Sequence, residues 1–586
     1  MLVIAIDSPV SVSSGVRRWS CDGGTTFGRG RTAGAVADSA GETRAGAVAE
    51  IGDPPTTNAT ASSPLKTWLP RRITVAFRAE VSRLNANRWG LFRGCLIQWC
   101  IVSNQPSLSQ LQRAAVRELL RVAPVIDEVG RRFAAAGHEI ALVGGPVRDL
   151  LLGRLSNDLD FATSARPDQI ETCLVGWVDA RWDMGRNYGT IGARVGEWDL
   201  EITTYRSDSY NGASRKPAVS FGDDLEGDLR RRDFAINAMA LVLPERRFVD
   251  PFGGMDDLVN ELLRTPSAPA TSFGDDPLRM LRAARFVAQL GFGVTPEGVG
   301  AMRELADHID IVSAERVRDE LVKLLLARAP RLGLGLLVET GLAGHVLPEL
   351  PALQLEVDEH HRHKDVYEHS LTVLEQAITL EDRLDGGGPD LVTRLAALLH
   401  DIGKPRTRRF SDDGSVTFHH HDVVGAKMAT KRMKALRFPN DVTADVSRLV
   451  ELHLRFHGYG SGEWTDSAVR RYVRDAGPLL DRLHVLTRAD CTTRNARKAD
   501  RLRRTYDDLE KRIDRLLVEE ELASMRPDLD GRQIMDVLGI APGPLVGKAY
   551  DFLLERRIEE GPLGAERARA ELLSWWASAE TGGAAP

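Results

Sequence analysis

Residues 143–163 read VGGPVRDLLLGRLSNDLDFAT, and the rest of the chain is organised around this stretch. The apolar run Ile140–Val143 predicts a strand that ends in two glycines. A helical spacing of apolar residues follows. The stretch ends in Asp158-Leu-Asp160-Phe, where the alternation of a strand places both carboxylates on one face. We therefore expect a strand, a glycine turn, a helix and a second strand in succession.

The two glycines and the two aspartates predict a site for a triphosphate and its metal ions. Gly144 and Gly145 stand at a helix start, where unpaired backbone N–H groups face an anion. Asp158 and Asp160 lie side by side, as suits divalent cations in a phosphate site. Many kinases and cyclases share these two features. Metal-dependent nucleotidyl transfer is our working interpretation.

The composition is that of a soluble, multidomain chain. It has 586 residues, 43% hydrophobic and 27% charged, with a net charge of −6. A surface for RNA must therefore be a local arginine patch. The five cysteines are scattered and odd in number, which favours a reducing cytoplasm over a disulfide framework. The longest apolar run near the start, residues 96–102, is too short to span a bilayer, so we expect no membrane partner. The sequence does not indicate an oligomeric state.

Residues 1–106 differ from the rest of the chain. The first part is rich in Gly, Ala, Ser and Thr with weak periodicity, and we expect a low-complexity, disordered extension. One hypothesis is that the working protein begins near Ser107. Mass spectrometry of the native N-terminus tests it, because peptides from residues 1–90 would contradict it.

Two segments beyond the opening stretch bear candidate polar groups. Glu201 sits within a β-branched strand pattern, either on a solvated face or as a third carboxylate beside the two aspartates. Residues 228–240 read DLRRRDFAINAMA and predict an apolar helix opened by arginines. Asp233 and Asn237 would share one face of this helix. A buried Asp/Asn pair needs partners, and a nucleotide supplies them.

Residues 275–286 predict a helix with a basic stripe. Asp276, Arg279, Arg282 and Arg285 recur at three-residue intervals. On pattern alone, a solvent-exposed, ion-paired helix is favoured. The alternative is that Asp276 and Arg279 present fixed donors and acceptors to a base edge while the other arginines hold phosphate.

A second constellation occupies the later helices. Histidines and aspartates follow one another on successive helical segments, and neutral imidazoles with carboxylates are typical ligands of transition metals. His419 and His420 are alternatives to His421 in this set. The set comprises His369, His400, Asp401, His421, His453 and Asp490.

Over about residues 110–575, these motifs resemble the bacterial class II CCA-adding tRNA nucleotidyltransferases with an appended HD domain, of the actinobacterial type, within the poly(A) polymerase superfamily. Asp275 departs from the family, which usually has a glutamate there, and this change bears on geometry rather than on activity. The matching motifs are GGPVRD (144–149) with Asp158-x-Asp160, RRDFAINAMA (231–240), DPFGG (250–254), DDPLR (275–279) and SAERVRDE (313–320).

The resemblance implies an α+β fold. A small polymerase-β-like nucleotidyltransferase head, a mixed sheet with helices, would precede an all-α neck, HD domain and tail. The implied domains are an extension at 1–106, a head at 107–262, a neck that binds nucleotide and RNA at 263–352, a metal-binding HD domain at 353–505, and a tRNA-binding tail at 506–586.

The resemblance also implies template-independent addition of CMP, CMP and AMP to tRNA from CTP and ATP, with Mg²⁺ in a two-metal mechanism. Asp158, Asp160 and Glu201 would be catalytic, the two aspartates as Mg²⁺ ligands. The implied nucleotide-binding residues are Gly144, Gly145, Arg148, Arg232, Asp233, Asn237, Asp276, Arg279, Arg282 and Arg285. The implied HD ligands are His369, His400, Asp401 and Asp490, with His421 and His453 as further ligands that admit a second ion.

Several alternatives stay open. A poly(A) polymerase shares the head motifs, and a CC-only or A-only adding enzyme is a further alternative. The HD domain would be a phosphohydrolase that uses a divalent transition metal of unknown identity. An alternative from a different functional class is that the protein is a phosphohydrolase whose head only binds RNA.

Overall fold

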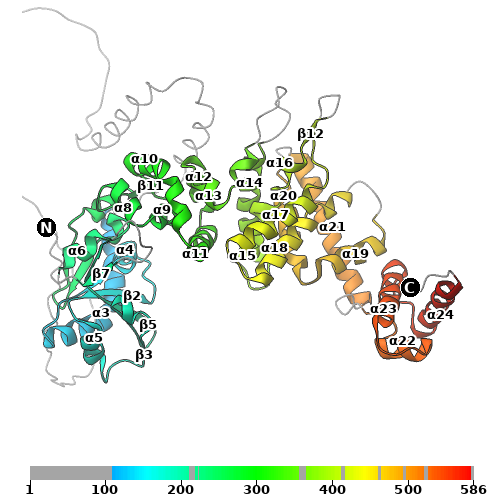
Figure 1. Cartoon of the computed structure of the whole chain (residues 1–586), viewed down its shortest axis with the longest axis horizontal. Helices are drawn as coiled ribbons and strands as arrows, with labels where there is room; N and C mark the ends of the chain where they lie inside the picture. The colour runs from blue at the N-terminus through cyan, green and yellow to red at the C-terminus, as the bar shows by residue number, and fades with distance from the viewer. Residues whose placement is uncertain are drawn as a thin grey trace, which may run out of the picture. The chain divides into compact units, whose positions relative to one another are not determined.

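The computed structural model describes residues 108–209, 218–221, 224–354, 365–410, 416–459, 464–492, 496–520 and 526–581. The predicted extension over residues 1–106 lies outside these ranges. Figure 1 shows a sheet with its helices at the start of the described chain and mostly helices from there to its end. The expected all-α remainder also holds two small sheets, which include β11 (Gly293–Val294) and β12 (Arg409–Phe410). The predicted α+β class is confirmed, whereas the domain boundaries stay predictions.

The head is built on a seven-stranded mixed sheet in the order β3-β4-β5-β2-β1-β8-β9. β2 and β5 are parallel neighbours, and the other neighbours are antiparallel. The strands are β1 (Ile140–Val143), β2 (Asp158–Thr163), β3 (Ala180–Trp182), β4 (Thr190–Val195), β5 (Trp198–Thr204), β8 (Ala240–Leu243) and β9 (Arg247–Val249). The remaining head elements are α3 (Leu108–Ala135), α4 (Gly145–Leu151), α5 (Pro167–Leu174), η2 (Arg186–Tyr188), β6 (Arg206–Ser209), β7 (Ala218–Phe221), α6 (Leu225–Arg230) and η3 (Ala235–Asn237).

Alternate residues of the central strand β1 face two different cores. Ile140 and Leu142 pack with the apolar side of α3. Ala141 and Val143 belong to a smaller cluster on the opposite face, to which α6 contributes Leu229. A strand buried on both faces reads as a continuous apolar run, which explains the sequence of β1.

The neck is organised around α9 (Leu278–Leu290), which packs against α11 (Ala314–Leu325) and α12 (Pro330–Glu339). Most residues of α9 are buried, including two of its arginines. α7 (Gly254–Val259) and β10 (Leu262–Leu263) come at the end of the head, and the other elements of the neck are α8 (Pro269–Asp275), β11 (Gly293–Val294), α10 (Pro296–Glu304), η4 (Ala306–Ile311), α13 (Leu342–Val346) and η5 (Pro351–Leu353).

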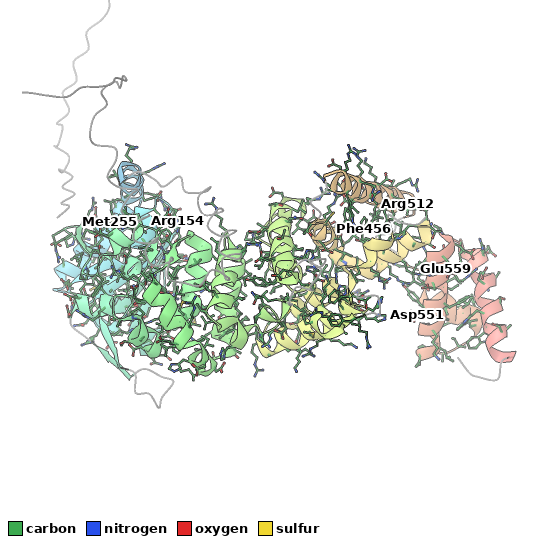
Figure 2. The ribbon with its side chains drawn as sticks, turned by 90° about the horizontal axis from the view of Figure 1, so that it is seen from above. Arg154, Met255, Phe456, Arg512, Asp551 and Glu559 are labelled. Atoms are coloured by element: carbon green, nitrogen blue, oxygen red, sulfur yellow. The ribbon has the colours of Figure 1, made fainter. Side chains whose placement is uncertain are left out.

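The HD region is a set of packed helices in which α17 and α18 form a close pair and α14, α15 and α20 pack together. Phe456 stacks on Tyr506 with ring centroids 3.7 Å apart, and Arg512 pairs with Asp466; Figure 2 labels Phe456 and Arg512. α21 runs without a break through the predicted boundary at 505/506. The elements are α14 (Val366–Thr379), η6 (Glu381–Arg383), α15 (Leu391–Leu399), α16 (Lys404–Thr407), β12 (Arg409–Phe410), β13 (Val416–Thr417), α17 (His421–Ala435), α18 (Asn440–Leu452), η7 (Arg455–Gly458), α19 (Asp466–Ala476), η8 (Gly477–Leu479), α20 (Leu480–Asp490) and α21 (Ala496–Glu520).

The last three helices have a core of their own. They are α22 (Gly531–Leu538), α23 (Pro544–Glu560) and α24 (Ala565–Thr581). Ile534, Leu553 and Leu572 are buried where the three helices meet. No helix among the described residues is long and apolar enough to cross a membrane.

The predicted helix over residues 228–240 is wrong. α6 ends at Arg230, a single 3₁₀ turn spans Ala235–Asn237, and the chain then enters β8. The sheet explains the difference, because Ala240 pairs with Val143 and every residue of β8 lies beside β1. Strand pairing with a distant segment overrides the local helical preference of an alanine-rich run.

The predicted helix over residues 275–286 is two helices. α8 ends at Asp275, and Asp276 has an extended backbone with φ of −139° before α9 begins at Leu278. Pro277 disfavours helical geometry at the residue that precedes it. Asp276 therefore lies in the junction between α8 and α9 rather than on the face of one helix.

Candidate functional site

The glycine turn joins β1 to α4. Gly144 has φ of +75°, and a Cβ there would lie 2.6 Å from a terminal guanidinium nitrogen of Arg232. The backbone conformation therefore requires glycine at this position, and a larger side chain would also displace the guanidinium of Arg232. α4 begins at Gly145. The guanidinium of Arg232 therefore lies beside the backbone of the turn, next to the first residue of the helix.

The carboxylates predicted to be catalytic share one face of the sheet. β2 and β5 run parallel, and Asp160 pairs with Glu201. Asp158 lies two residues before Asp160 on the same strand, so its side chain points to the same face of the sheet. Burial raises the pKa of Asp160 to about 6; Arg232 opposes the shift, and Glu201 and Asp158 add to it. A cation among the three carboxylates would relieve this repulsion. Among the described residues, the groups of three possible ligand atoms that lie within 4.8 Å of one another are both in the HD region. The oxygens of Asp158, Asp160 and Glu201 do not form such a group.

A buried chain of hydrogen bonds connects the glycine-turn helix to the neck. Arg148 donates to Asn237 Oδ1 (2.7 Å), and Asn237 donates to Asp233 Oδ1 (2.9 Å). Arg282 of α9 donates to Asp233 Oδ2 (2.8 Å). Burial opposes the charge of Asp233, but Arg282 and these hydrogen bonds hold its pKa well below the usual range. Asp233 and Asn237 are thus brought together as predicted, although no continuous helix connects them.

Glu320 of α11 completes this network, and the sequence analysis gave it no role. It lies 3.1 Å from Arg285 and 3.6 Å from Arg282. Burial, with help from the charge of Arg282, lowers the pKa of Arg285 to about 10, and Glu320 opposes that shift. A signal was present in the sequence: Glu320 falls on the same helix face as Val317 and Leu324, where a charged side chain needs a buried partner.

The two residues predicted to read a base are held by neighbouring elements. Arg279 donates to Ser272 Oγ (2.8 Å) and to the carbonyls of Ser272 and Arg231. Asp276 Oδ2 lies 3.2 Å from a guanidinium nitrogen of Arg316. Ser272 and Arg316 were missed by the sequence analysis, because their contacts join separate helices.

The expectation of a solvent-exposed arginine stripe is wrong for two of its members. Arg279 and Arg285 are 8% and 7% exposed. α9 is surrounded by the rest of the neck and by residues 233–237, so its arginines face ion-pair and carbonyl partners inside the protein.

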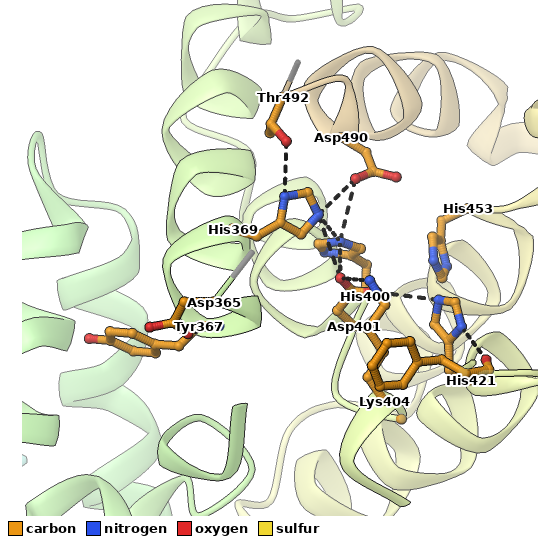
Figure 3. A network of polar contacts seen from close by, with 12 residues as sticks. Asp365, Tyr367, His369, His400, Asp401, Lys404, His421, His453, Asp490 and Thr492 are labelled. Atoms are coloured by element: carbon orange, nitrogen blue, oxygen red, sulfur yellow. Dashed lines mark hydrogen bonds and ion pairs between the residues drawn. The ribbon is translucent and has the colours of Figure 1, made fainter. Parts of the chain in front are cut away.

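The HD centre, defined as His369, His400, Asp401, His421, His453 and Asp490, forms where five helices begin or end (Figure 3). His369 Nε2 lies 3.0 Å from Asp490 Oδ1, and His400 Nε2 lies 3.2 Å from Asp401 Oδ2. His419 and His420 are exposed and outside this cluster. The structure therefore brings together all six predicted ligands.

Three of the histidines are fixed in one tautomer. The Nδ1 atoms of His400, His421 and His453 lie 2.9, 2.8 and 2.6 Å from backbone carbonyls, which can only accept. Each Nδ1 therefore donates, so in the neutral form of each ring the Nε2 atom presents a lone pair to the centre. Burial lowers the pKa of His453 to about 4, which keeps its ring neutral near pH 7. Neutral imidazoles with fixed Nε2 atoms fit metal ligation.

Two observations test the fit of a metal ion further. The Nε2 atoms of His421 and His453 are buried and make no hydrogen bond. Buried polar atoms of this kind are rare in folded proteins and call for a partner. Lys404, which the sequence analysis gave no role, places Nζ 2.6 Å from Asp401 Oδ2. Lys404 thus occupies one oxygen of Asp401, whereas the donor set of imidazole nitrogens and carboxylate oxygens fits a divalent transition metal better than Mg²⁺, which prefers oxygen ligands.

Three family models match consecutive parts of the chain. The Poly A polymerase head domain matches residues 140–264. The probable RNA and SrmB-binding site of polymerase A matches residues 291–353, and the HD domain matches residues 366–495.

Two curated relatives match about three quarters of the chain, and a third matches a shorter part. An A-adding tRNA nucleotidyltransferase of Deinococcus radiodurans is 36% identical over 444 residues, covering 74% of this chain and 95% of the relative. A CC-adding tRNA nucleotidyltransferase of Thermus thermophilus is 34% identical over 442 residues, covering 74% and 93%. A CCA-adding enzyme of Bacillus subtilis is 40% identical over 224 residues, covering 38% and 54%.

Solved structures show the same fold. A CCA-adding enzyme of Bacillus stearothermophilus in complex with CTP superposes with a TM-score of 0.56 at 23% identity, covering 78% of this chain and 97% of that structure. A CCA-adding enzyme in complex with ATP gives a TM-score of 0.54 at 17% identity, covering 79% and 98%.

Proposed function

Because the chain belongs to the tRNA nucleotidyltransferase family, we propose that it adds CMP, CMP and AMP in turn to the 3′ end of tRNA. CTP and ATP are the donors, and pyrophosphate leaves. The observation that carries this proposal is the strand register that puts Asp160 opposite Glu201 beside the glycine turn. These substrates make the cytoplasm the proposed setting.

Asp158 and Asp160 are the proposed ligands of Mg²⁺, with Glu201 as a third carboxylate on the same face. When bound, the ions lower the pKa of the RNA 3′-hydroxyl and neutralise the triphosphate. The hydroxyl loses its proton to solvent water, and its oxygen forms a bond to the α-phosphorus. The bond from that phosphorus to the bridging oxygen breaks in line, and pyrophosphate departs with the electron pair.

The glycine turn and its basic neighbours are the proposed triphosphate site. Gly144 and Gly145 supply backbone N–H groups at the start of α4, and the guanidinium of Arg232 lies close to Gly144. Arg148 donates a hydrogen bond to Asn237, which in turn donates to Asp233. These hydrogen bonds fix the orientation of Arg148 before a nucleotide enters, so binding costs little side-chain entropy.

Base choice is proposed to rest on Asp276 and Arg279. A carboxylate accepts from the exocyclic amino group that cytosine and adenine share, and a guanidinium donates to the neighbouring ring nitrogen. Uracil and guanine present an oxygen and a ring N–H there, so both contacts would be reversed. Arg316 and Ser272 hold the two side chains in position, while Arg282 and Arg285 are proposed to support the phosphates.

An end-labelling assay tests the proposal. The full chain is incubated with tRNA that lacks its 3′ end, together with CTP and ATP. Three added nucleotides followed by a stop are expected. A long A tail would identify a poly(A) polymerase instead, and a stop after two C residues or one A residue would identify a partial-end enzyme. If no nucleotide is added, the result would favour the alternative in which the head only binds RNA.

The HD centre supports a second activity. Its fixed Nε2 atoms and convergent carboxylates fit a divalent transition metal, and we propose a metal-dependent phosphohydrolase acting on RNA ends or nucleotides. Hydrolysis of p-nitrophenyl phosphate and of its bis-ester, compared between the parent and His400→Ala, tests this activity. Equal hydrolysis by the two proteins would contradict it.

A further inference from the structure

Trp182 lies on the face of the head sheet that carries the proposed metal ligands. Trp182 of β3 pairs with Gly192 of β4, and Gly192 pairs with Glu201 of β5. Glu201 in turn pairs with Asp160 of β2. Residues that pair directly across neighbouring strands point to the same face of a sheet. One row across four strands therefore runs from Asp160 to Trp182.

Gly192 allows the indole of Trp182 to lie across β4. A Cβ at Gly192 would overlap three atoms of the indole ring, Nε1, Cε2 and Cδ1. Gly192 lies in the interior of a strand, where a glycine often marks the close approach of another group. The ring therefore extends from the edge strand β3 over β4, towards the carboxylates.

Trp182 is not part of the core of the head. Ile191 and Ala193, the neighbours of Gly192 on β4, are fully buried in the core on the opposite face of the sheet. Trp182 is only partly buried, and it belongs to none of the hydrophobic clusters among the described residues. A partly exposed aromatic ring that is held over a sheet is a surface on which a nucleic-acid base can stack.

The strand order indicates the side from which the RNA arrives. The glycine turn follows β1 and lies on one side of β2, whereas β5, β4 and β3 lie on the other side. The triphosphate is proposed to bind at the glycine turn, and in-line attack places the 3′-hydroxyl opposite the departing pyrophosphate. The acceptor end of the RNA therefore passes over β5 and β4. Trp182 lies on this path, two strand spacings or about 10 Å from Glu201.

Stacking suits an acceptor whose last base changes during the reaction. In the proposed reaction, the terminal base is first that of the tRNA without its CCA end and then cytosine. Hydrogen bonds to base edges at this position would select one base and would hinder the next addition. Every base has a π-face, so an aromatic ring can hold each successive end in the same place.

We propose that Trp182 stacks on the 3′-terminal base of the tRNA and thereby holds the 3′-hydroxyl beside the metal ligands. This inference rests on the proposed nucleotide addition and adds a residue that contacts the acceptor. The sequence analysis gave Trp182 no role, because its place in the row with Glu201 depends on the pairing of β3 with β4 and of β4 with β5.

Steady-state kinetics of the full chain test the proposal. Trp182→Ala should raise KM for tRNA that lacks its 3′ end by roughly 5- to 100-fold, as expected for the loss of one base stack, and should leave KM for CTP unchanged. Trp182→Phe keeps an aromatic ring and should have a smaller effect. Trp177→Ala is the matched control, because it removes a partly buried indole that packs against the core on the opposite face. An unchanged KM for tRNA in Trp182→Ala, or an equal rise of KM for CTP, would overturn the proposal.

Photocrosslinking tests the same contact without nucleotide addition and without a substitution. A tRNA whose last nucleotide is the first C of the CCA end, present as 5-iodocytidine, is irradiated with the full chain in the absence of CTP and ATP. Mass spectrometry is expected to find the crosslink at Trp182. A crosslink confined to other peptides would overturn the proposal, even if the chain adds nucleotides. A crosslink at Trp182 in a chain that adds none would support the stacking contact and contradict the proposed addition.

Discussion

The head site and the HD centre both gather carboxylates, but they are built on different elements and from different ligands. In the head, Asp160 and Glu201 lie on neighbouring strands, and Arg232 lies close to Asp160. In the HD centre, histidines at helix ends point Nε2 atoms at one another, and two of these atoms make no hydrogen bond. Both sites are thus partly neutralised by basic side chains of the protein, Arg232 in the head and Lys404 in the HD centre, but the HD centre also holds two buried Nε2 atoms that make no hydrogen bond.

This difference predicts different metal behaviour. Oxygen ligands alone suit Mg²⁺, which keeps several waters and is bound through carboxylates together with substrate phosphates. Imidazole ligands select transition metals and hold them without a substrate. We therefore expect the ions of the head to exchange with each turnover and those of the HD centre to stay with the protein.

The largest expected effect is the loss of a head carboxylate. Asp158→Ala or Asp160→Ala should lower nucleotide incorporation by on the order of 10³-fold or more, since stabilisation by the ions contributes several kcal/mol and each 1.4 kcal/mol is tenfold. Binding of tRNA, measured by filter retention, should change little. Asp199→Asn is the control, because Asp199 lies on the same strand face but is paired with Arg194. Near-normal incorporation by the two alanine variants would remove the metal assignment.

Chelation should separate the two sites. After EDTA treatment, both incorporation and any hydrolysis of phosphate esters should be lost, because both sites depend on cations. Re-addition of Mg²⁺ alone should restore incorporation but not hydrolysis, whereas Mn²⁺ should restore both. Parallel recovery of both activities by Mg²⁺ would show that the two sites share one metal preference and would break the comparison.

The buried pairing of the neck should be visible in stability. Glu320→Gln leaves Arg285 without its charged partner, and breaking a buried ion pair should lower the free energy of unfolding by about 3 kcal/mol. Glu339→Gln is the matched control, since its pair with Arg303 is about half exposed and should contribute below about 1 kcal/mol. Urea unfolding followed by tryptophan fluorescence measures both. Equal midpoints for the two variants would show that the network does not support the neck.

Two substitutions in the neck should lower the discrimination between CTP and UTP by different amounts. Arg279→Ala removes the proposed donor to the ring nitrogen, and the preference for CTP over UTP should fall by roughly 10- to 100-fold, as for one bidentate base contact. Ser272→Ala, which removes one of the hydrogen bonds that hold Arg279, should shift the same ratio by a smaller factor. The measurement is kcat/KM for each nucleotide on tRNA that already carries the first C of its CCA end. An unchanged ratio in Arg279→Ala would remove the base-reading role.

The sequence predicted those parts of the sites that depend on local periodicity. Period-two alternation placed Asp158 and Asp160 on one face, and the helix-end pattern identified His400 and Asp401. The sheet order put Glu201 on the same face, which required β5 to pair with β2 in one register. A shift of one residue would have turned Glu201 to the opposite face, and nothing local in the sequence specifies that register.

The parts that the sequence did not predict are contacts between distant segments. Ser272, Arg316 and Glu320 each meet a predicted site residue from another helix. The arginines of α9 matched a solvated stripe in spacing, but the neck helices cover them. Periodicity states which residues share a face of one helix, and it does not state what that face contacts.

The smallest expected effect is a dependence of the head on pH. Because burial raises the pKa of Asp160 to about 6, its carboxylate is largely protonated at pH 5 and largely charged at pH 7. Protons and Mg²⁺ compete for the same oxygens, so incorporation at limiting Mg²⁺ should fall by roughly tenfold from pH 7 to pH 5. Raising the Mg²⁺ concentration should move the midpoint to lower pH. A midpoint that does not move with the Mg²⁺ concentration would place the titrating group away from the proposed metal ligands.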